Sequence, residues 1–313
     1  MVGLLEATGN YRVLRRLEPR ARYASPRPGA PLRRGLIVDV ETTGLDTAND
    51  RIIELGLVAF EYDDSGQVYG VDPQREWFED PGVPIPAEAV EITGITDEMV
   101  RGQHIDRAAV EAEIARANLI IAHNAGFDRP VLERYFQSLR ETHWACSLRD
   151  VPWSRFGCRG GKLDYLLLQL CHAFHTGHRA GDDCLATLHV LASPRDGDIT
   201  PLSLLRQQAL RKTVRLSAIG SPIGSKDLLK ARGYRWFNGS IASQKAKTWY
   251  KDIYAEDVKA EQQWLRDHVY RGISEPQWQL EEFTAKERYS ERASEMAAGA
   301  VSQPTPASTA VAD

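Results

Sequence analysis

Short apolar runs rich in β-branched residues predict three strands, at residues 35–46, 51–64 and 67–71. Apolar residues at helical spacing predict four helices, at residues 105–118, 127–139, 163–174 and 182–192. A buried strand at residues 119–125 separates the first two helices. Strands first, then alternating strand and helix, indicate an α/β domain with a mixed sheet covered by helices. We place this domain at residues 35–195.

The composition changes on both sides of the predicted domain. Residues 1–34 form a basic segment that includes a Pro-rich stretch from residue 20, which we expect to be an extended linker. Residues 196–216 suit a polar helix or a linker. Residues 217–272 predict a small α+β appendage, and residues 284–313 have the Ala, Ser, Thr, Pro and Glu composition of a disordered tail.

The overall composition is that of a globular protein with about two domains. The chain has 313 residues, of which 42% are hydrophobic and 26% are charged. No apolar run reaches the roughly 18 residues that a membrane-spanning helix needs, and the start has no cleavage-site pattern. The four cysteines form no CxxC pair. We therefore expect no membrane partner and a reducing, cytoplasmic location.

The net charge of −4 is unevenly distributed. Residues 1–34 carry eight Arg and two Glu, and residues 196–313 carry 17 basic and 15 acidic side chains. Residues 35–195 carry 14 basic and 26 acidic side chains. Solvated surfaces often scatter charge in this way. The alternative is an acidic middle that holds cations, between basic flanks that meet a polyanion.

Two carboxylates end the first predicted strand. Asp39 and Glu41 are two residues apart, so both side chains project from the same face of the strand. Asp128 follows the strand at residues 119–125, where helix capping is the alternative explanation. His178 precedes Asp183 by five residues at the start of the last predicted helix.

As one site, these residues have the composition of a two-metal centre. Three or four carboxylates can hold two divalent cations about 3.5–4 Å apart for displacement at a phosphate. Oxygen ligands favour Mg²⁺ or Mn²⁺ over zinc. An imidazole such as that of His178 can accept the proton of an attacking water.

Three segments in order, DVETTGLD, AHNAGFD and HRAGDD, resemble the exonuclease motifs of the DEDDh 3′–5′ exonucleases, the superfamily of the DNA polymerase III epsilon subunit and ribonuclease T. The resemblance covers about residues 35–193. It implies a ribonuclease-H-like fold and two-metal release of nucleoside monophosphates from a 3′ end. The positions that match the family's metal carboxylates are Asp39, Glu41, Asp128 and Asp183, and His178 matches the catalytic histidine.

The resemblance also implies contacts with the terminal nucleotide. The matching positions are Thr42, Thr43 and Leu45, with Asn124 and Phe127 from the second motif. Where the family often has His-Gly-Ile-Thr, this chain has Thr93 in the histidine position. We expect that change to affect the nucleotide pocket and not the activity.

A second candidate binding region is residues 226–251, with seven Lys or Arg, one Asp and five aromatic residues. Aromatic side chains interleaved with cations can stack bases and pair with phosphates. The alternative is that the same aromatics form the core of a small domain, with two strands around a turn at Asn238–Gly239. The candidate nucleic-acid contacts are Lys230, Arg232, Arg235, Trp236, Lys245, Lys247 and Trp249.

The resulting hypothesis is a metal-dependent 3′–5′ exonuclease that acts on DNA 3′ ends. An exoribonuclease acting on RNA has the same catalytic positions, and an inactive nucleic-acid-binding module is the alternative from another class. A DNA polymerase is a possible protein partner. Three cysteines at intervals of 13, Cys158, Cys171 and Cys184, lack the short paired spacing of zinc sites, so we expect free cysteines in helices.

Overall fold

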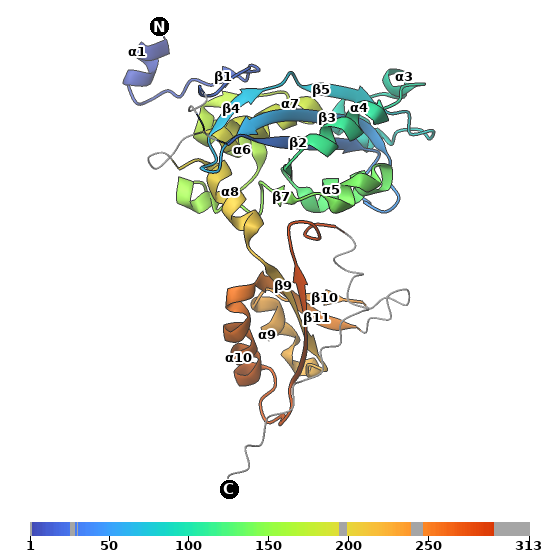
Figure 1. Cartoon of the computed structure of the whole chain (residues 1–313), viewed down its shortest axis with the longest axis vertical. Coiled ribbons are helices and arrows are strands. Elements are labelled where there is room, and N and C mark those ends of the chain that lie inside the picture. The colour runs from blue at the N-terminus through green and yellow to red at the C-terminus, as the bar shows by residue number, and fades with distance from the viewer. Residues whose placement is uncertain (1, 26–28, 30, 194–198, 239–246, 291–313) are drawn as a thin grey trace. The chain divides into compact units, whose positions relative to one another are not determined.

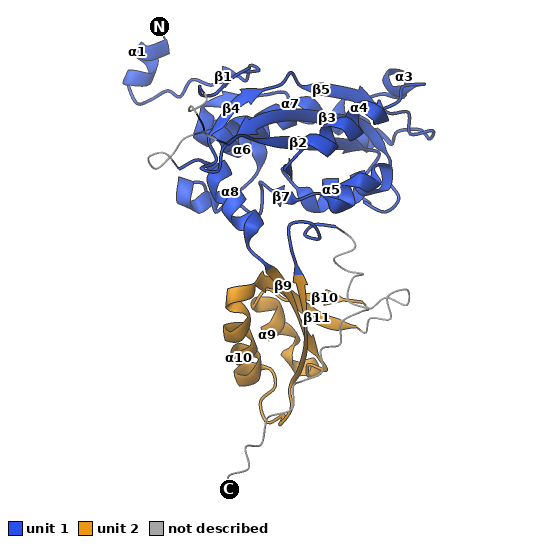
Figure 2. Ribbon diagram, viewed as in Figure 1, with its two compact units in different colours: residues 1–212, 283–290 blue, residues 213–282, 291–313 orange. Residues whose placement is uncertain are grey.

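The computed structural model describes residues 2–25, 29, 31–193, 199–238 and 247–290 (Figure 1). It divides into two compact units, shown in blue and orange in Figure 2. The first comprises residues 1–212 and 283–290, and the second comprises residues 213–282 together with residues beyond 290. The second unit is therefore inserted into the first, and the chain returns to the first unit after it. No helix in the described ranges is long and apolar enough to cross a bilayer.

A mixed sheet forms the centre of the first unit, as the strand pattern predicts. Its strand order is β4 (Val68–Val71), β3 (Ile52–Tyr62), β2 (Arg33–Thr42), β6 (Leu119–Ala122) and β7 (Trp144–Cys146). β5 (Arg75–Phe78) also pairs with β3. β2 is antiparallel to β3 and parallel to β6, which in turn is parallel to β7. β5 and β7 are short strands that the apolar pattern does not predict.

Helices cover both faces of this sheet, which confirms the predicted fold class. One core cluster joins alternate sheet residues such as Ile37 to α7 (Ala180–Ala192) and α8 (Pro201–Leu210). The other joins Leu36 and Val38 to α4 (Arg107–Arg116) and α5 (Ala125–Tyr135). Because neighbouring residues of a strand face opposite sides, β2 is buried on both. Smaller elements complete the unit: α1 (Val2–Ala7), α2 (Ala87–Thr93), α3 (Asp97–Val100), and 3₁₀ turns at Gln137–Glu141 and Trp153–Phe156.

The segment at 163–174 differs from its prediction as one helix. α6 (Leu163–Leu166) continues as a π-helical turn, Leu167–Cys171, and then ends at His172 in the left-handed conformation. β8 (Ala173–Phe174) follows and pairs in parallel with β1 (Arg15–Arg16) from the N-terminal segment. π turns often occur at functional sites because they offset the side chains that follow.

The N-terminal and C-terminal segments also differ from the predictions for them. Tyr23, in the expected linker, donates its backbone N–H to Tyr69 of β4 (2.9 Å). In the expected tail, residues 284–290 pack into the first unit, where the fully buried Arg129 donates to the backbone carbonyls of Ala285, Lys286 and Arg288. The prediction of disorder is therefore wrong for 284–290, because buried partners outweigh composition. The rest of that tail lies outside the described residues.

The second unit is a small α+β domain, as predicted, but it spans residues 213–282 and not 217–272, because β9 begins at Thr213 and β12 completes the sheet after residue 272. Its sheet has the order β10 (Arg235–Phe237), β11 (Thr248–Tyr254), β9 (Thr213–Ile219) and β12 (Gln277–Phe283). It also contains α9 (Lys226–Ala231) and α10 (Val258–His268), with 3₁₀ turns at Ile223–Ser225 and Ala255–Asp257. β10 and β11 are antiparallel, and Gly239 of the expected turn lies outside the described residues.

Candidate active site

Two carboxylates lie on β2, on the face that α7 covers. Asp39 and Glu41 share the face of Ile37, which packs in the same core cluster as the apolar side chains of α7. The register with β3 sets Gly56 opposite Asp39 and Glu54 opposite Glu41. The strand therefore presents two acids to the start of the helix.

The start of α7 is held against β3 by contacts that bring Asp183 to the same place. The buried Glu54 accepts the backbone N–H of Ala180 (2.9 Å) and pairs with Arg179 (2.6 Å), so it caps the helix from the neighbouring strand. A Cβ atom at Gly56 would lie 2.3 Å from the carbonyl carbon of Ala180. Glycine at this position therefore lets the helix approach the strand closely.

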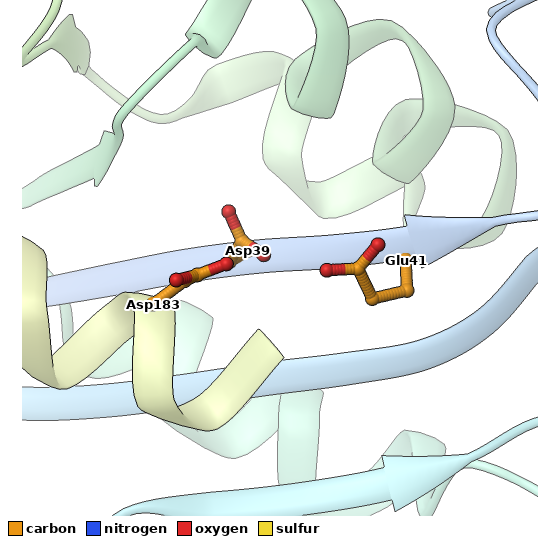
Figure 3. A group of neighbouring side chains, drawn as sticks. All are labelled: Asp39, Glu41 and Asp183. Atoms are coloured by element: carbon orange, nitrogen blue, oxygen red, sulfur yellow. The ribbon is translucent and has the colours of Figure 1, made fainter. Parts of the chain in front are cut away.

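Figure 3 shows the result: Asp183 of α7 points toward Asp39 and Glu41 of β2. One carboxylate oxygen from each residue lies within 4.8 Å of the others. Asp128 of α5 is buried, and the backbone of Val40, the residue between the two β2 acids, lowers its pKa against the larger effect of burial. It is outside the group of three, yet its charge acts on Asp39.

Crowding and burial raise the pKa values of these acids. Burial, followed by the charges of Asp128 and Asp183, raises the pKa of Asp39 well above its ordinary value. Burial and the charges of Asp183 and Glu54 raise the pKa of Glu41 to about 8. Burial also raises the pKa of Asp128 to about 7. Without a cation the site therefore resists full ionisation at neutral pH.

The donor set fits divalent metal ions. Three oxygen donors converge, and their mutual repulsion is the free energy that a bound cation relieves. Among the described residues, this trio is the one group of acidic, His and Cys side chains that converges in this way. None of these cysteines forms a disulfide among the described residues. Cys184 is buried in α7 and Cys171 is half-buried in the π-helical turn, as predicted for cysteines in helices, whereas the buried Cys158 lies outside a helix, after the turn Trp153–Phe156.

Two histidines lie near Asp183, and His178 is the one that the sequence motif predicts to be catalytic. His178 is exposed, adopts a left-handed backbone conformation (φ 63°) and donates its backbone N–H to Asp183 (3.2 Å). His175, whose side chain is 4% exposed, contacts the same carboxylate through Nε2 at 2.5 Å. Burial alone would lower the pKa of His175, but the Asp183 hydrogen bond and the Asp164 charge raise it. His175 carries no sequence signal because its contact depends on the turn that precedes α7.

The residues predicted to contact a nucleotide divide into turn-forming and exposed groups. The Thr42 hydroxyl donates to the carbonyl of Gly44 (2.5 Å), and the Thr43 hydroxyl donates to Asp50 (2.8 Å). Both threonines are buried, whereas Leu45 is 89% exposed. The threonines therefore shape the turn that follows β2, and Leu45 is available to a ligand.

The second motif contributes a helix start. Asn124 is exposed and precedes α5, and Phe127 packs partly into the core of that face. Thr93, in place of the family's histidine, is buried and donates to the carbonyl of Ala89 (2.8 Å). Its hydroxyl therefore supplies a hydrogen bond to a backbone carbonyl of α2.

The structure also tests which aromatic residues of the second unit can meet a ligand. Trp249 is 8% exposed and packs in the unit's core with Leu216 and Leu265. It is therefore a core residue, and its prediction as a base-stacking residue is wrong, since stacking needs a free ring face. Trp236 is 46% exposed and donates its ring N–H to Asn238 (3.0 Å). Its ring remains accessible.

Some of the predicted cationic side chains of the second unit form ion pairs with acidic residues. Arg232 pairs with Glu261 (3.1 Å), and Arg235 pairs with Asp252 (3.2 Å). Other members of the predicted set, Lys230 and Lys247, are exposed, and Lys245 lies outside the described residues. Ion pairing reduces the charge that the two arginines offer to a phosphate.

Comparison with known families gives a match over the first unit. Residues 36–191 match the RNase_T family, described as exonuclease. A DNA polymerase III PolC-type of Clostridium perfringens is 33% identical over 161 residues, which cover 50% of this chain and 11% of that protein. A DNA polymerase III PolC-type of Thermotoga petrophila is 28% identical over 229 residues, covering 70% of this chain and 15% of that protein. The matched segments thus span a small part of these relatives.

Two solved structures of exonucleases are similar to part of the chain. Exonuclease X in complex with 5′-overhanging duplex DNA has 21% identity and a TM-score of 0.39, covering 54% of this chain and 99% of that one. The zinc-bound exonuclease I of E. coli in complex with single-stranded DNA has 16% identity and a TM-score of 0.47, covering 71% of this chain and 63% of that one.

Proposed function

Because residues 36–191 belong to the exonuclease family, we propose that this chain removes nucleoside 5′-monophosphates from the 3′ end of DNA with two divalent metal ions. The observation that carries the proposal is the convergence of Asp39, Glu41 and Asp183 from two separate elements. The PolC-type names of the relatives support DNA as the polymer.

In this proposal four acids would hold Mg²⁺ or Mn²⁺. Asp39 and Glu41 come from β2, Asp183 from α7, and Asp128 from α5. The bound cations would activate water and neutralise charge at the scissile phosphate. His178, which is exposed and donates its backbone N–H to Asp183, would accept the proton of the attacking water. Leu45, Asn124 and Phe127 would contact the terminal nucleotide, beside the turn that Thr42 and Thr43 shape.

His175 and Glu54 act through other groups and are positioning residues. His175 orients the Asp183 carboxylate, as outer hydrogen bonds do for metal ligands elsewhere. Glu54 fixes the start of α7 and so the position of Asp183 relative to β2. Both residues restrict the geometry of the acids before any cation binds.

The test is a 5′-labelled single DNA strand incubated with the full chain and Mg²⁺. A ladder that shortens from the 3′ end is expected, with EDTA stopping it and Mn²⁺ restoring it. Asp39→Ala or Asp183→Ala should abolish turnover. Activity that survives thorough chelation would refute the metal mechanism, and release of the labelled 5′ nucleotide without a ladder would refute the direction.

A matched RNA strand separates the exoribonuclease alternative from the DNA enzyme in the same assay. Binding of both strands with no cleavage in Mg²⁺ or Mn²⁺ would support the inactive binding module. A DNA polymerase is the protein partner to test, by co-sedimentation with the full chain, since the relatives' names supply that candidate.

A further inference from the structure

The N-terminal segment from Tyr11 to Leu17, which we name the arginine arm, is attached to the loop that precedes α7. The backbone N–H of Arg15 donates to the carbonyl of His172 (3.0 Å), and that of Leu17 donates to Phe174 (2.8 Å). β1 thereby pairs in parallel with β8. Backbone pairing fixes the course of the arm independently of its side chains.

Side chains add to this attachment at the end nearest the active site. The guanidinium of Arg16 donates to the hydroxyl of Thr176 (3.3 Å) and lies over the ring of Phe174 at 5.1 Å. Arg12 donates to Gln169 (3.2 Å). Thr176 is the residue after His175, which contacts Asp183. The arm is therefore linked to the candidate site through a single short loop.

The arm presents cations and an aromatic ring to solvent. Arg12, Arg15 and Arg16 are exposed, and Tyr11 is 59% exposed. A hollow of about 420 Å³, within the usual size range of ligand sites, is lined by Tyr11, Arg12 and His172, together with Glu6, Gly9 and Asn10. Exposed arginines beside an aromatic ring have the chemistry that binds phosphates and stacks bases.

A cationic surface at this place answers an electrostatic need of the site. The acids on β2, α5 and α7 repel a polyanion, and Arg179 beside them is paired with Glu54 (2.6 Å). Arginines held near the site by backbone bonds offset that repulsion along the incoming strand.

We propose that the arginine arm is a phosphate-binding track for the single nucleic-acid strand that enters the active site, with Arg15 and Arg16 on its phosphates and Tyr11 beside a base. The proposal rests on the proposed nuclease function for the identity of the strand. A dinucleotide has a single internal phosphodiester, which the active site would occupy, so it leaves no internal phosphate for the arm. The track therefore serves long strands.

The test measures binding and turnover separately. Binding of a 20-nucleotide oligothymidylate is followed by fluorescence anisotropy against NaCl concentration, in an Asp183→Asn background that cannot turn over. Hydrolysis of a dinucleotide is measured with Asp183 intact. The variants are Arg15→Gln/Arg16→Gln and Arg15→Gln alone, the second of which keeps the bond between Arg16 and Thr176.

The matched control is Arg101→Gln/Arg140→Gln, which removes two exposed arginines from outside the arm. Loss of two phosphate contacts should weaken long-strand binding about 10-fold near 0.1 M salt and reduce the salt slope by about 1.4. Replacing Arg15 alone should weaken binding and lower the salt slope by about half as much. Dinucleotide hydrolysis should stay within about twofold, since the arm acts beyond the terminal nucleotides.

Three results would overturn the track. The first is an unchanged salt slope in both arm variants, which would leave the arm to a protein partner or to no ligand. The second is an equal loss in the control, which would show a general charge effect. The third is an equal loss of dinucleotide hydrolysis and of long-strand binding. That result would mean that the arm only holds the loop of residues 172–178 in position. If no variant hydrolyses anything, the nuclease proposal fails, while the salt slope still decides the track.

Discussion

Replacing Glu41 by Gln should stabilise the metal-free protein, although it removes a proposed metal ligand. In the absence of cations, Glu41 lies among Asp39, Asp183 and Glu54, and its pKa is raised from 4.5 to about 8. A carboxyl that binds its proton more tightly when folded opposes folding wherever the unfolded chain would ionise it. Gln has nearly the same shape and no charge to bury.

The size and sign of the effect depend on pH. The folded state holds the extra proton between the ordinary pKa of 4.5 and the raised value of about 8, so the wild-type protein loses stability as pH rises through this window. The variant lacks this loss. Its advantage should be below about 1 kcal/mol at pH 5 and reach between about 1 and 3 kcal/mol at pH 8, where the lower figure allows for solvent screening of a half-buried group.

The assay is urea unfolding of the full chain in EDTA at pH 5 and pH 8. Amide hydrogen exchange of β2 and β3 reports on the first unit separately, because two units need not unfold together. Saturating Mn²⁺ should reverse the order of stability. A ligand at about 100 times its Kd adds about 2.7 kcal/mol to a protein that binds it, and the variant should gain less.

Glu61→Gln on β3 is the control, since Glu61 is exposed on the strand next to β2. It should change stability by less than about 0.5 kcal/mol at both pH values. Equal stability of wild-type and Glu41→Gln protein at pH 8 in EDTA would show that the acids do not repel one another. A bound cation would then have no repulsion among these acids to relieve.

The remaining predictions test the supporting residues. His178→Ala should lower turnover about 10²–10⁴-fold with Mn²⁺ half-saturation unchanged, whereas His175→Ala should raise that half-saturation about 10–100-fold; the reverse pattern would exchange the two roles. Gly56→Ala should also raise the Mn²⁺ concentration for half-saturation, because the new Cβ would lie 2.3 Å from Ala180. Gly160→Ala should leave that concentration unchanged, because its Cβ would have nothing within 4 Å. Arg129→Met should cost about 3–5 kcal/mol, because it removes the cation beside buried Glu133 and the donor to the carbonyls of residues 285–288. Urea unfolding would measure this loss, and a value below about 1 kcal/mol would contradict the role of Arg129 in holding residues 284–290.

Local pattern was sufficient for β2, β3, β4 and β6 of the main sheet and for the approach of two acids. Alternation along residues 36–41 predicts that Asp39 and Glu41 share a face, and the structure has them on β2 facing α7. The apolar spacing of residues 182–192 likewise predicts the helix that carries Asp183. These features follow from backbone geometry within a few residues, which a sequence displays directly.

Contacts between distant segments could not be predicted from the local sequence pattern. The residues that orient the acids, Glu54 and His175, have no spacing that marks them, because they act across a strand pair and a turn. Trp249 and Trp236 lie in the same basic, aromatic stretch, yet only tertiary packing buries one and exposes the other. Periodicity cannot tell a core aromatic from a stacking one in a domain this small.

The sequence by itself therefore determined the α/β class, the order of the catalytic motifs and the residues that could ligate a metal. The tertiary structure decided that the second unit is inserted into the first and that residues 284–290 return to the first unit. It also decided that β1 of the arginine arm pairs with β8. The physical reason is the range of the interactions. Strand and helix patterns are local, whereas burial of Arg129 and pairing of β1 with β8 join residues more than 150 positions apart in sequence, and their free energy exists only once the chain has folded.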